Sequence, residues 1–224
     1  MGTAATDFTA QREAMVEQQL KRRGIIEPEI LDAFRAVPRE VFVRSEYGHL
    51  AYGDHPLPID AGQTISQPYI VALMIQAAAI KPDDKVLEVG SGSGYAAAVI
   101  GRIAGRVIGI ERQHELVEVA RERLVRLGYA NVDIVEGDGT KGWAAEAPYD
   151  AILAAASGSH VPRSLIDQLA AGGRLVMPVG NPGSVQKLIR VTKRPDARVQ
   201  QTELCEVRFV PLIGEEGWKA GPTS

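Results

Sequence analysis

The chain has 224 residues, 45% of them hydrophobic and 24% charged, which is the composition of one globular domain able to bury most of its apolar surface. Its net charge of −3 is spread over mixed signs, so electrostatics gives no reason to expect nucleic acid or an anionic membrane as a partner. A single cysteine excludes an internal disulfide, and no run of about eighteen apolar residues is present to span a bilayer. Because the first residues also lack a basic and then apolar signal segment, we expect a cytoplasmic protein.

Residues 1–80 are expected to form an N-terminal helical cap, over about the first sixty residues, and a substrate and active-site loop. Apolar residues recur at helical spacing among charged ones over 8–23, and Gly24 is placed to end that helix. Pro28 suits the first turn of a second helix. Residues 41–61 show no clear period, which indicates an ordered but irregular segment. The cap precedes a nucleotide-type core, so substrate selection could reside in it.

The cap ends in the loop 62–68, which leads into an almost wholly apolar helix over 69–79. Pro68 suits the first turn of this helix, and either Ser66 or Gln67 is placed to cap its N-terminus. Ser66 is therefore open to two interpretations, as a helix cap or as a functional residue, and both can hold together.

The central feature of the sequence is a glycine-rich turn. An apolar run at 86–89 predicts a strand, and residues 95–104 predict a helix. A second apolar run at 106–110 ends at Glu111, which completes a βαβ unit. The glycines at alternate positions between the first strand and the helix are Gly90, Gly92 and Gly94. They let the backbone turn sharply and approach a ligand, and an acid at the second strand end can accept hydrogen bonds from ribose hydroxyls.

The spacing of these glycines is G-x-G-x-G, whereas the dinucleotide fingerprint is G-x-G-x-x-G and a P-loop ends in Gly-Lys-Ser/Thr. Glu88 also argues against a pyrophosphate here, because its carboxylate would repel phosphate. A cationic ligand with an amino group and a sulfonium would suit it. The turn with its ribose acid thus resembles the S-adenosyl-L-methionine (AdoMet) site of the class I methyltransferases, with a dinucleotide site or a structural turn as the alternatives.

The third strand of the core is predicted over 132–136, after a helix over 113–127. The strand runs into Gly137-Asp138-Gly139, which parallel-sheet geometry places at the same edge as the glycine turn. Asp138 could accept a hydrogen bond from an adenine amino group. The alternative is turn chemistry, for which Asp-Gly is strongly favoured.

The remaining elements complete an α/β, Rossmann-like class I methyltransferase fold, with a mostly parallel seven-stranded sheet. Strands are predicted over 149–155 and 174–179, with a helix over 162–169 between them. Two alternating runs, 185–193 and 198–210, have no helix between them and should form a C-terminal antiparallel hairpin. The AdoMet-binding core would then be 81–213, followed by a loose tail at 214–224, and the whole would be a single structural domain.

Several blocks of this sequence together resemble the protein-L-isoaspartate O-methyltransferase family in its bacterial form. The resemblance covers about residues 10–213, and its most specific parts are Thr64-Ile65-Ser66-Gln67-Pro68 and Val207-Arg208-Phe209-Val210-Pro211-Leu212. The other blocks are 37–43, 51–59, 69–72, 86–95, 137–139 and 172–180.

The resemblance implies transfer of a methyl group from AdoMet to the free α-carboxyl of L-isoaspartyl residues in damaged proteins and peptides, with S-adenosyl-L-homocysteine as product. This ester formation initiates protein repair. It implies Ser66 as the catalytic residue and a substrate-binding set of Thr64, Ile65, Ser66, Arg208 and Val210. The implied cofactor-binding set is Gln63, Thr64, Ile65, Glu88, Gly90, Ser91, Gly92, Gly94, Glu111, Arg112, Asp138 and Gly139.

The chemistry of the acceptor agrees with the side chains present. A carboxylate is already ionised at neutral pH and needs no general base, so the lack of a convincing histidine or cysteine constellation is expected. The four histidines show no ligand spacing, and we expect no metal. Two alternatives remain: an aspartate O-methyltransferase of peptide natural-product maturation, and a non-catalytic AdoMet-binding module. We also expect a monomer, with neither nucleic acid nor membrane as a partner.

Overall fold

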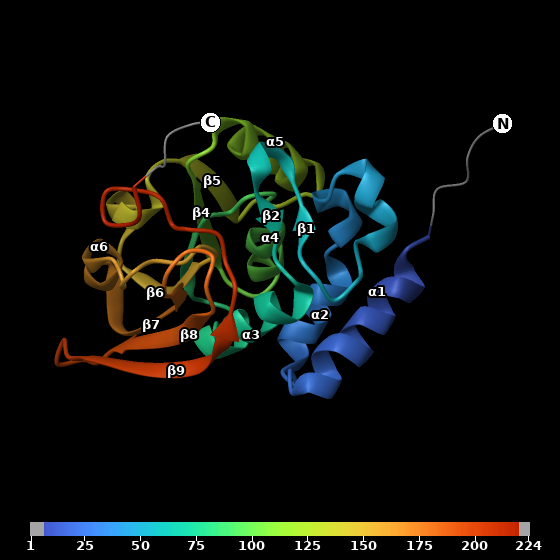
Figure 1. Cartoon of the computed structure of the whole chain (residues 1–224). Coiled ribbons are helices and arrows are strands. Elements are labelled where there is room, and N and C mark those ends of the chain that lie inside the picture. The colour runs from blue at the N-terminus through green and yellow to red at the C-terminus, as the bar shows by residue number, and fades with distance from the viewer. Residues whose placement is uncertain (1–6, 220–224) are drawn as a thin grey trace.

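The computed structural model describes residues 7–219. Its centre is a seven-stranded sheet in the order β5-β4-β3-β6-β7-β8-β9 (Figure 1). The strand bounds in that order are Val132–Glu136, Arg106–Glu111, Lys85–Val89, Tyr149–Ala154, Leu169–Val179, Gln186–Lys193 and Val199–Val207. The first five strands are parallel, β8 pairs in antiparallel fashion with both β7 and β9, and the predicted fold class and hairpin are therefore confirmed.

The helices of the core are α3, α4, α5 and α6. Their bounds are Pro68–Ala78, Tyr95–Gly101, His114–Arg126 and Arg163–Asp167. Alternate residues of each strand face two different hydrophobic clusters, as the twofold period of a strand requires. Val86 packs in the cluster that contains α3, α4 and α5, whereas Leu87 packs in the cluster that contains α6. Glu88 therefore projects on the side of α3, α4 and α5.

The register of the parallel strands brings their carboxyl ends to one level. Val89 at the end of β3 lies opposite Ile110 of β4 and Ala154 of β6, and Glu111 of β4 lies opposite Glu136 of β5. The loops that follow these strands consequently meet at one edge of the sheet, where open α/β sheets bind their ligands.

The cap packs beside the core, next to α3 and α4 (Figure 1). It begins with α1 at Thr9–Met15, a π-helical stretch at Val16–Leu20 and a 3₁₀ turn at Lys21–Arg23. The predicted helical span thus ends at Gly24, whose φ of 93° is left-handed, but the π-helical stretch was not predicted. The second helix, α2, covers Pro28–Ala36 as expected.

The irregular segment of the cap contains 3₁₀ turns at Arg39–Phe42 and Ser45–Leu50 and one feature that the sequence did not predict. The two-residue strands β1 (Leu57–Pro58) and β2 (Thr64–Ile65) pair in antiparallel fashion. This ladder fixes the loop that enters α3. Gln67 occupies the cap position of α3 without a side-chain cap bond, so the interpretation of Ser66 as the helix cap is wrong.

Three boundaries differ from the predictions. The helix α4 ends at Gly101 rather than near residue 104, and α6 is short because β7 already begins at Leu169. The last strand, β9, ends at Val207, so Arg208 and Val210 follow the strand and do not form part of it.

The expected loose tail is wrong for residues 214–219, because they are bound to the core. Trp218 donates its indole N–H to the carbonyl of Ser157 over 2.9 Å, and Glu216 accepts hydrogen bonds from the backbone and hydroxyl of Ser164. Residues 220–224 lie outside the described residues. Within the described part of the chain, no helix is long and apolar enough to cross a membrane, and no group of His, Cys, Asp or Glu side chains could hold a metal ion.

We predict that Trp218→Ala lowers the free energy of unfolding by about 2 kcal/mol, less than for a fully buried tryptophan because Trp218 is half-buried. The loss combines apolar contact with one hydrogen bond. Urea unfolding measures it, with Lys219→Ala at the exposed neighbouring position as the control. Equal stability of the two variants would show that the tail is not held by Trp218.

Candidate active site

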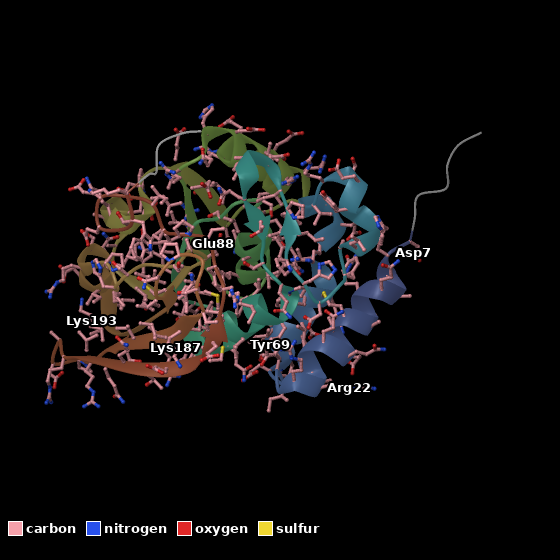
Figure 2. All side chains as sticks on the ribbon, viewed as in Figure 1. Asp7, Arg22, Tyr69, Glu88, Lys187 and Lys193 are labelled. Carbon is pink, nitrogen blue, oxygen red and sulfur yellow. The ribbon has the colours of Figure 1, made fainter. Side chains whose placement is uncertain are left out.

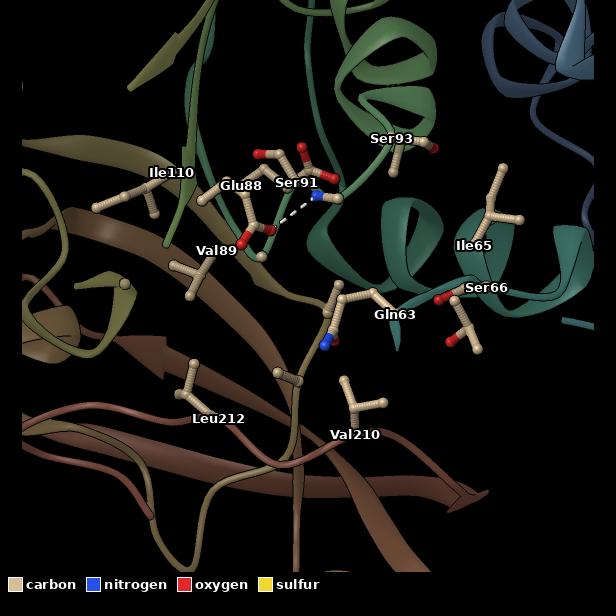
Figure 3. A pocket seen from close by; sticks show the side chains of 18 of the residues that line it. Gln63, Ile65, Ser66, Glu88, Val89, Ser91, Ser93, Ile110, Val210 and Leu212 are labelled. Atoms are coloured by element: carbon tan, nitrogen blue, oxygen red, sulfur yellow. Dashed lines mark hydrogen bonds between the residues drawn. The ribbon is translucent and has the colours of Figure 1, made fainter. Parts of the chain in front are cut away.

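A cavity of about 310 Å³ opens at the carboxyl ends of β3, β4 and β6. In Figure 3, Glu88, Ser66 and Val210 lie on different walls of it. The lining residues that the sequence predicted are Gln63, Thr64, Ile65, Ser66, Glu88, Gly90, Ser91, Gly92, Glu111, Arg112, Gly139 and Val210. Segments far apart in the sequence, from the cap loop to the segment after β9, therefore meet around one space.

The glycine turn depends on backbone angles that other residues rarely adopt. Gly90 and Gly92 line the cavity with φ values of 83° and 51°. A methyl group added to Gly92 would lie 3.3 Å from Ile59 Cδ1, which shows how closely the cap loop approaches the turn. Gly94 has a φ of 87° but does not line the cavity, and a methyl there would lie 3.2 Å from Ala120 Cβ. The predicted cofactor contact of Gly94 therefore stays a prediction, and in this structure the glycine permits close helix packing.

Glu111 ties the turn to the end of β4. One carboxylate oxygen accepts a hydrogen bond from the Gly92 amide over 3.0 Å. The other accepts from the amides of Arg112 at 2.7 Å and Gln113 at 3.0 Å. The side chain is 7% exposed and lines the cavity. A carboxylate has about four acceptor positions, so roughly one remains for a ligand hydroxyl.

Glu88 is a buried acid with one carboxyl oxygen that has no partner within residues 7–219. It lies within the body of the molecule, whereas Asp7 and Arg22 lie at its periphery (Figure 2). It is 2% exposed, and its Oε2 has no hydrogen-bond partner among the described residues. Burial raises the pKa of Glu88 to about 8, and the charge of Glu111 contributes to the rise. Such a group at a cavity wall suits a ligand that brings positive charge.

The loop at Gln63–Ser66 faces the glycine turn across the cavity. Thr64 and Ile65 are held by the short ladder with β1, and Ser66 is partly exposed to the cavity. The carbonyl of Ser66 accepts a hydrogen bond from Arg39 over 2.8 Å. The backbone of this loop is therefore fixed, which leaves the hydroxyl of Ser66 available on the cavity side.

Asp138 and Arg208 are absent from the cavity wall. One oxygen of Asp138 accepts hydrogen bonds from the amide and hydroxyl of Thr140, at 2.9 and 2.7 Å. The other accepts from the amide of Glu215 over 2.8 Å. The structure thus shows the turn chemistry of Asp138 and adds a bond to the tail, while Gly139 does line the cavity. Arg208 is exposed outside it.

The sequence did not predict two polar residues of the cavity lining, Ser93 and Tyr95, or its apolar lining residues. Ser93 lies between Gly92 and Gly94 and Tyr95 follows Gly94, and both line the cavity with exposures of 3% and 1%. The missed apolar residues are Val71, Met74, Ile100, Leu153, Pro211, Leu212 and Ile213. The signal for the first two was the apolar face of α3, which is indistinguishable in sequence from an ordinary core face.

A model of the protein-L-isoaspartate(D-aspartate) O-methyltransferase family matches residues 10–217, nearly the whole chain. The chain belongs to this family. A protein-L-isoaspartate O-methyltransferase of Pelobacter propionicus is 55% identical over 208 residues, covering 93% of this chain and 92% of the relative. One of Rhodopseudomonas palustris is 55% identical over 214 residues, covering 96% and 87%.

Solved structures of the protein-L-isoaspartate O-methyltransferase family share the fold. One such enzyme aligns with a TM-score of 0.84 at 31% identity, covering 92% of this chain and 67% of the other. A second, assigned to the same activity in Plasmodium falciparum, aligns with a TM-score of 0.78 at 29% identity, covering 90% and 98%. That structure contains S-adenosyl-L-homocysteine.

We predict that Glu88 makes the ligand-free protein lose stability as the pH rises from about 5 to about 8. The pKa of about 8 in the folded state lies above the ordinary glutamate value of 4.5, so the folded state holds a proton that the unfolded chain releases in this range. Glu88→Gln should abolish this loss, so its melting temperature should exceed that of the wild type by more at pH 8.5 than at pH 5. The exposed Glu115→Gln is the control. Parallel pH profiles for wild type and Glu88→Gln would contradict the assignment.

Proposed function

We infer that this protein transfers a methyl group from AdoMet to the free α-carboxyl of L-isoaspartyl residues in proteins and peptides, initiating their repair. The observation that carries this inference is that two different sets of residues face each other across one cavity. The buried acids Glu88 and Glu111 form one wall, and the loop at Thr64–Ser66 forms the other. Membership of the family, at 55% identity to relatives of that name, supports the same activity.

The residues present fit AdoMet. The unpartnered oxygen of Glu88 would face its positive charge, and Glu111 would accept a hydrogen bond from a ribose hydroxyl. Gly90 and Gly92 leave room for close approach of the ligand to the backbone. When bound, the cofactor supplies a methyl group that a positively charged sulfur makes electrophilic.

The acceptor side needs orientation more than activation. The substrate α-carboxyl has a model-compound pKa near 3.5 and arrives as an anion, so no residue has to remove a proton. Ser66 would orient this carboxylate by donating its hydroxyl hydrogen bond. Alignment of the reacting atoms can then supply much of the rate acceleration.

Exclusion of water completes the site. The segment Val210–Ile213 closes one side of the cavity, and Leu212 within it is 5% exposed. The hydrogen bond from the Trp218 amide to the carbonyl of Leu212, at 2.8 Å, holds this segment in place. A dry cavity strengthens the attraction between the anionic acceptor and its cationic methyl donor. We also propose a monomeric state and a cytoplasmic location.

The experiment that tests the proposed function is transfer of radiolabelled methyl from AdoMet to an isoaspartyl peptide, beside a twin peptide that contains normal aspartate. We expect label on the isoaspartyl peptide only, as base-labile methyl ester. Transfer to the aspartyl twin alone would favour maturation of a peptide natural product. Transfer to neither, with AdoMet bound, would indicate a binding module.

Two variants should separate the two walls of the site. Ser66→Ala should lower turnover strongly while AdoMet affinity stays near that of the wild type. Glu111→Ala should weaken AdoMet binding by roughly 1–3 kcal/mol, because it removes charge-assisted hydrogen bonds to the ligand and to the turn. Calorimetry gives the affinities and the methylation assay gives the turnover, and each variant is the control for the other. Wild-type turnover in Ser66→Ala would exclude a catalytic role for the serine.

A further inference from the structure

Arg39 is a fully buried arginine that contacts both walls of the active site. Its exposure is 0%. It donates one hydrogen bond from Nε to the carbonyl of Ala51 and one from Nη2 to the carbonyl of Ser66, both over 2.8 Å. Its guanidinium lies over the ring of Tyr95, with 4.7 Å between Cζ and the ring centroid. Three separate segments therefore meet at one side chain.

The charge of Arg39 has no counter-charge. Among residues 7–219 no carboxylate forms an ion pair with it, and its Nη1 has no hydrogen-bond partner. The neighbouring Glu40 pairs with Arg12 and Tyr52 instead. Burial of an unpaired guanidinium costs several kcal/mol, whereas an apolar side chain would fill the same space without that cost. General packing is thus a weak explanation for an arginine here.

The anchor of Arg39 on the cap is rigid. Tyr52, the neighbour of Ala51, is held by two hydrogen bonds. Its backbone carbonyl accepts one from Gln19 over 2.7 Å, and its side-chain hydroxyl accepts one from Arg12 over 2.8 Å. Gln19 lies in the π-helical stretch of the cap. The position of the guanidinium is consequently set by the packed cap, and the Ser66 carbonyl is set by the guanidinium.

The guanidinium of Arg39 also contacts Tyr95, which lies next to the glycine turn on the side of the cavity that would bind the methyl donor. Tyr95 is the first residue of α4, directly after the glycine turn, and it lines the cavity. Phe34 and Phe42 hold its ring edge-on, with centroid separations of 6.2 and 5.5 Å. Arg39 thus packs on a ring that cannot shift independently of the turn.

We propose that Arg39 is a positioning residue, which holds the Ser66 loop at a fixed distance from the glycine turn so that acceptor and methyl donor are aligned. This proposal rests on the proposed function in its assignment of Ser66. Because Arg39 lies behind the cavity wall, it acts through Ser66 and Tyr95 and does not touch the substrate.

Arg174 provides a control at the opposite end of the same helix, although it also forms an ion pair with Asp84 over 2.9 Å, which Arg39 lacks within the described chain. Arg39 fixes the entry to α3 through Ser66, whereas Arg174 fixes its exit by donating to the carbonyls of Ala78 and Ala79. Both arginines therefore bridge two backbone carbonyls. Only Arg39 does so beside the cavity.

The experiment compares Arg39→Met with Arg174→Met in the full-length protein. We expect both variants to lower the melting temperature. Only Arg39→Met should lower kcat for the isoaspartyl peptide, by about 10- to 100-fold. Its dissociation constant for AdoMet should stay within about twofold of the wild-type value. Arg39→Lys should recover kcat only in part, because an ammonium lacks the fork that reaches two carbonyls. Where Arg39→Met does not fold, Arg39→Lys and Arg39→Gln are compared with Arg174→Lys instead.

A second measurement does not depend on activity. Hydrogen exchange of the amides at 64–70 should accelerate in Arg39→Met and not in Arg174→Met. Unchanged kcat and unchanged exchange in Arg39→Met, or equal loss of kcat in both methionine variants, would overturn the proposal. A wild-type protein that methylates no isoaspartyl peptide would instead overturn the proposed function, and the exchange result would still decide whether Arg39 holds the loop.

Discussion

The hydrogen bonds of the Glu111 carboxylate are the interaction on which the site depends. They join the end of β4 to the amide of Gly92, and so fix the glycine turn that follows β3. The parallel register places these two strand ends side by side. Without this carboxylate the amides of Gly92, Arg112 and Gln113 would lose their partner. The turn would then stay tied to β4 through the bonds from Gly90 and Ser91 to the carbonyl of Ile110. The group expected to bind ribose is thereby also the group that shapes the turn.

Charge is distributed across the cavity in a way that matches the reaction. The wall around the glycine turn holds two buried acidic side chains, and one oxygen of Glu88 has no hydrogen-bond partner among the described residues. The opposite wall is backed by Arg39, a buried cation without a counter-ion. Each wall is unfavourable alone, because burial makes ionisation of Glu88 costly and the charge of Arg39 is buried without an ion-pair partner in the described part of the chain. A positive methyl donor and a negative acceptor offset these costs when both bind, and transfer of the methyl group neutralises the two ligands together.

The fold followed from periodicity and spacing, because each strand, helix and glycine of the core is encoded locally. The strand of Val86–Val89, the turn at Gly90 and Gly92 and the acid Glu111 all lie within one short segment. What could not be predicted depends on contacts between distant segments. The bond between Asp138 and Glu215 spans 77 residues, and that between Arg39 and Ser66 spans 27. A local pattern at Asp138 shows only the Asp-Gly turn, and Arg39 follows a Val-Pro pair that indicates no more than a helix end.

The two ends of the chain therefore act on the cavity from different directions. The cap sets the position of Ser66 through Arg39, and the tail holds residues 210–213 through the bond from Trp218 to Leu212. The parallel core between them supplies the glycine turn and the acids. A peptide acceptor must be admitted on one side while water is excluded around the methyl donor. Separate segments carry these two tasks, namely the loop at residues 63–66 and the segment at residues 210–213. The sequence of each segment can therefore change without any change in the register of the sheet that holds the cofactor site.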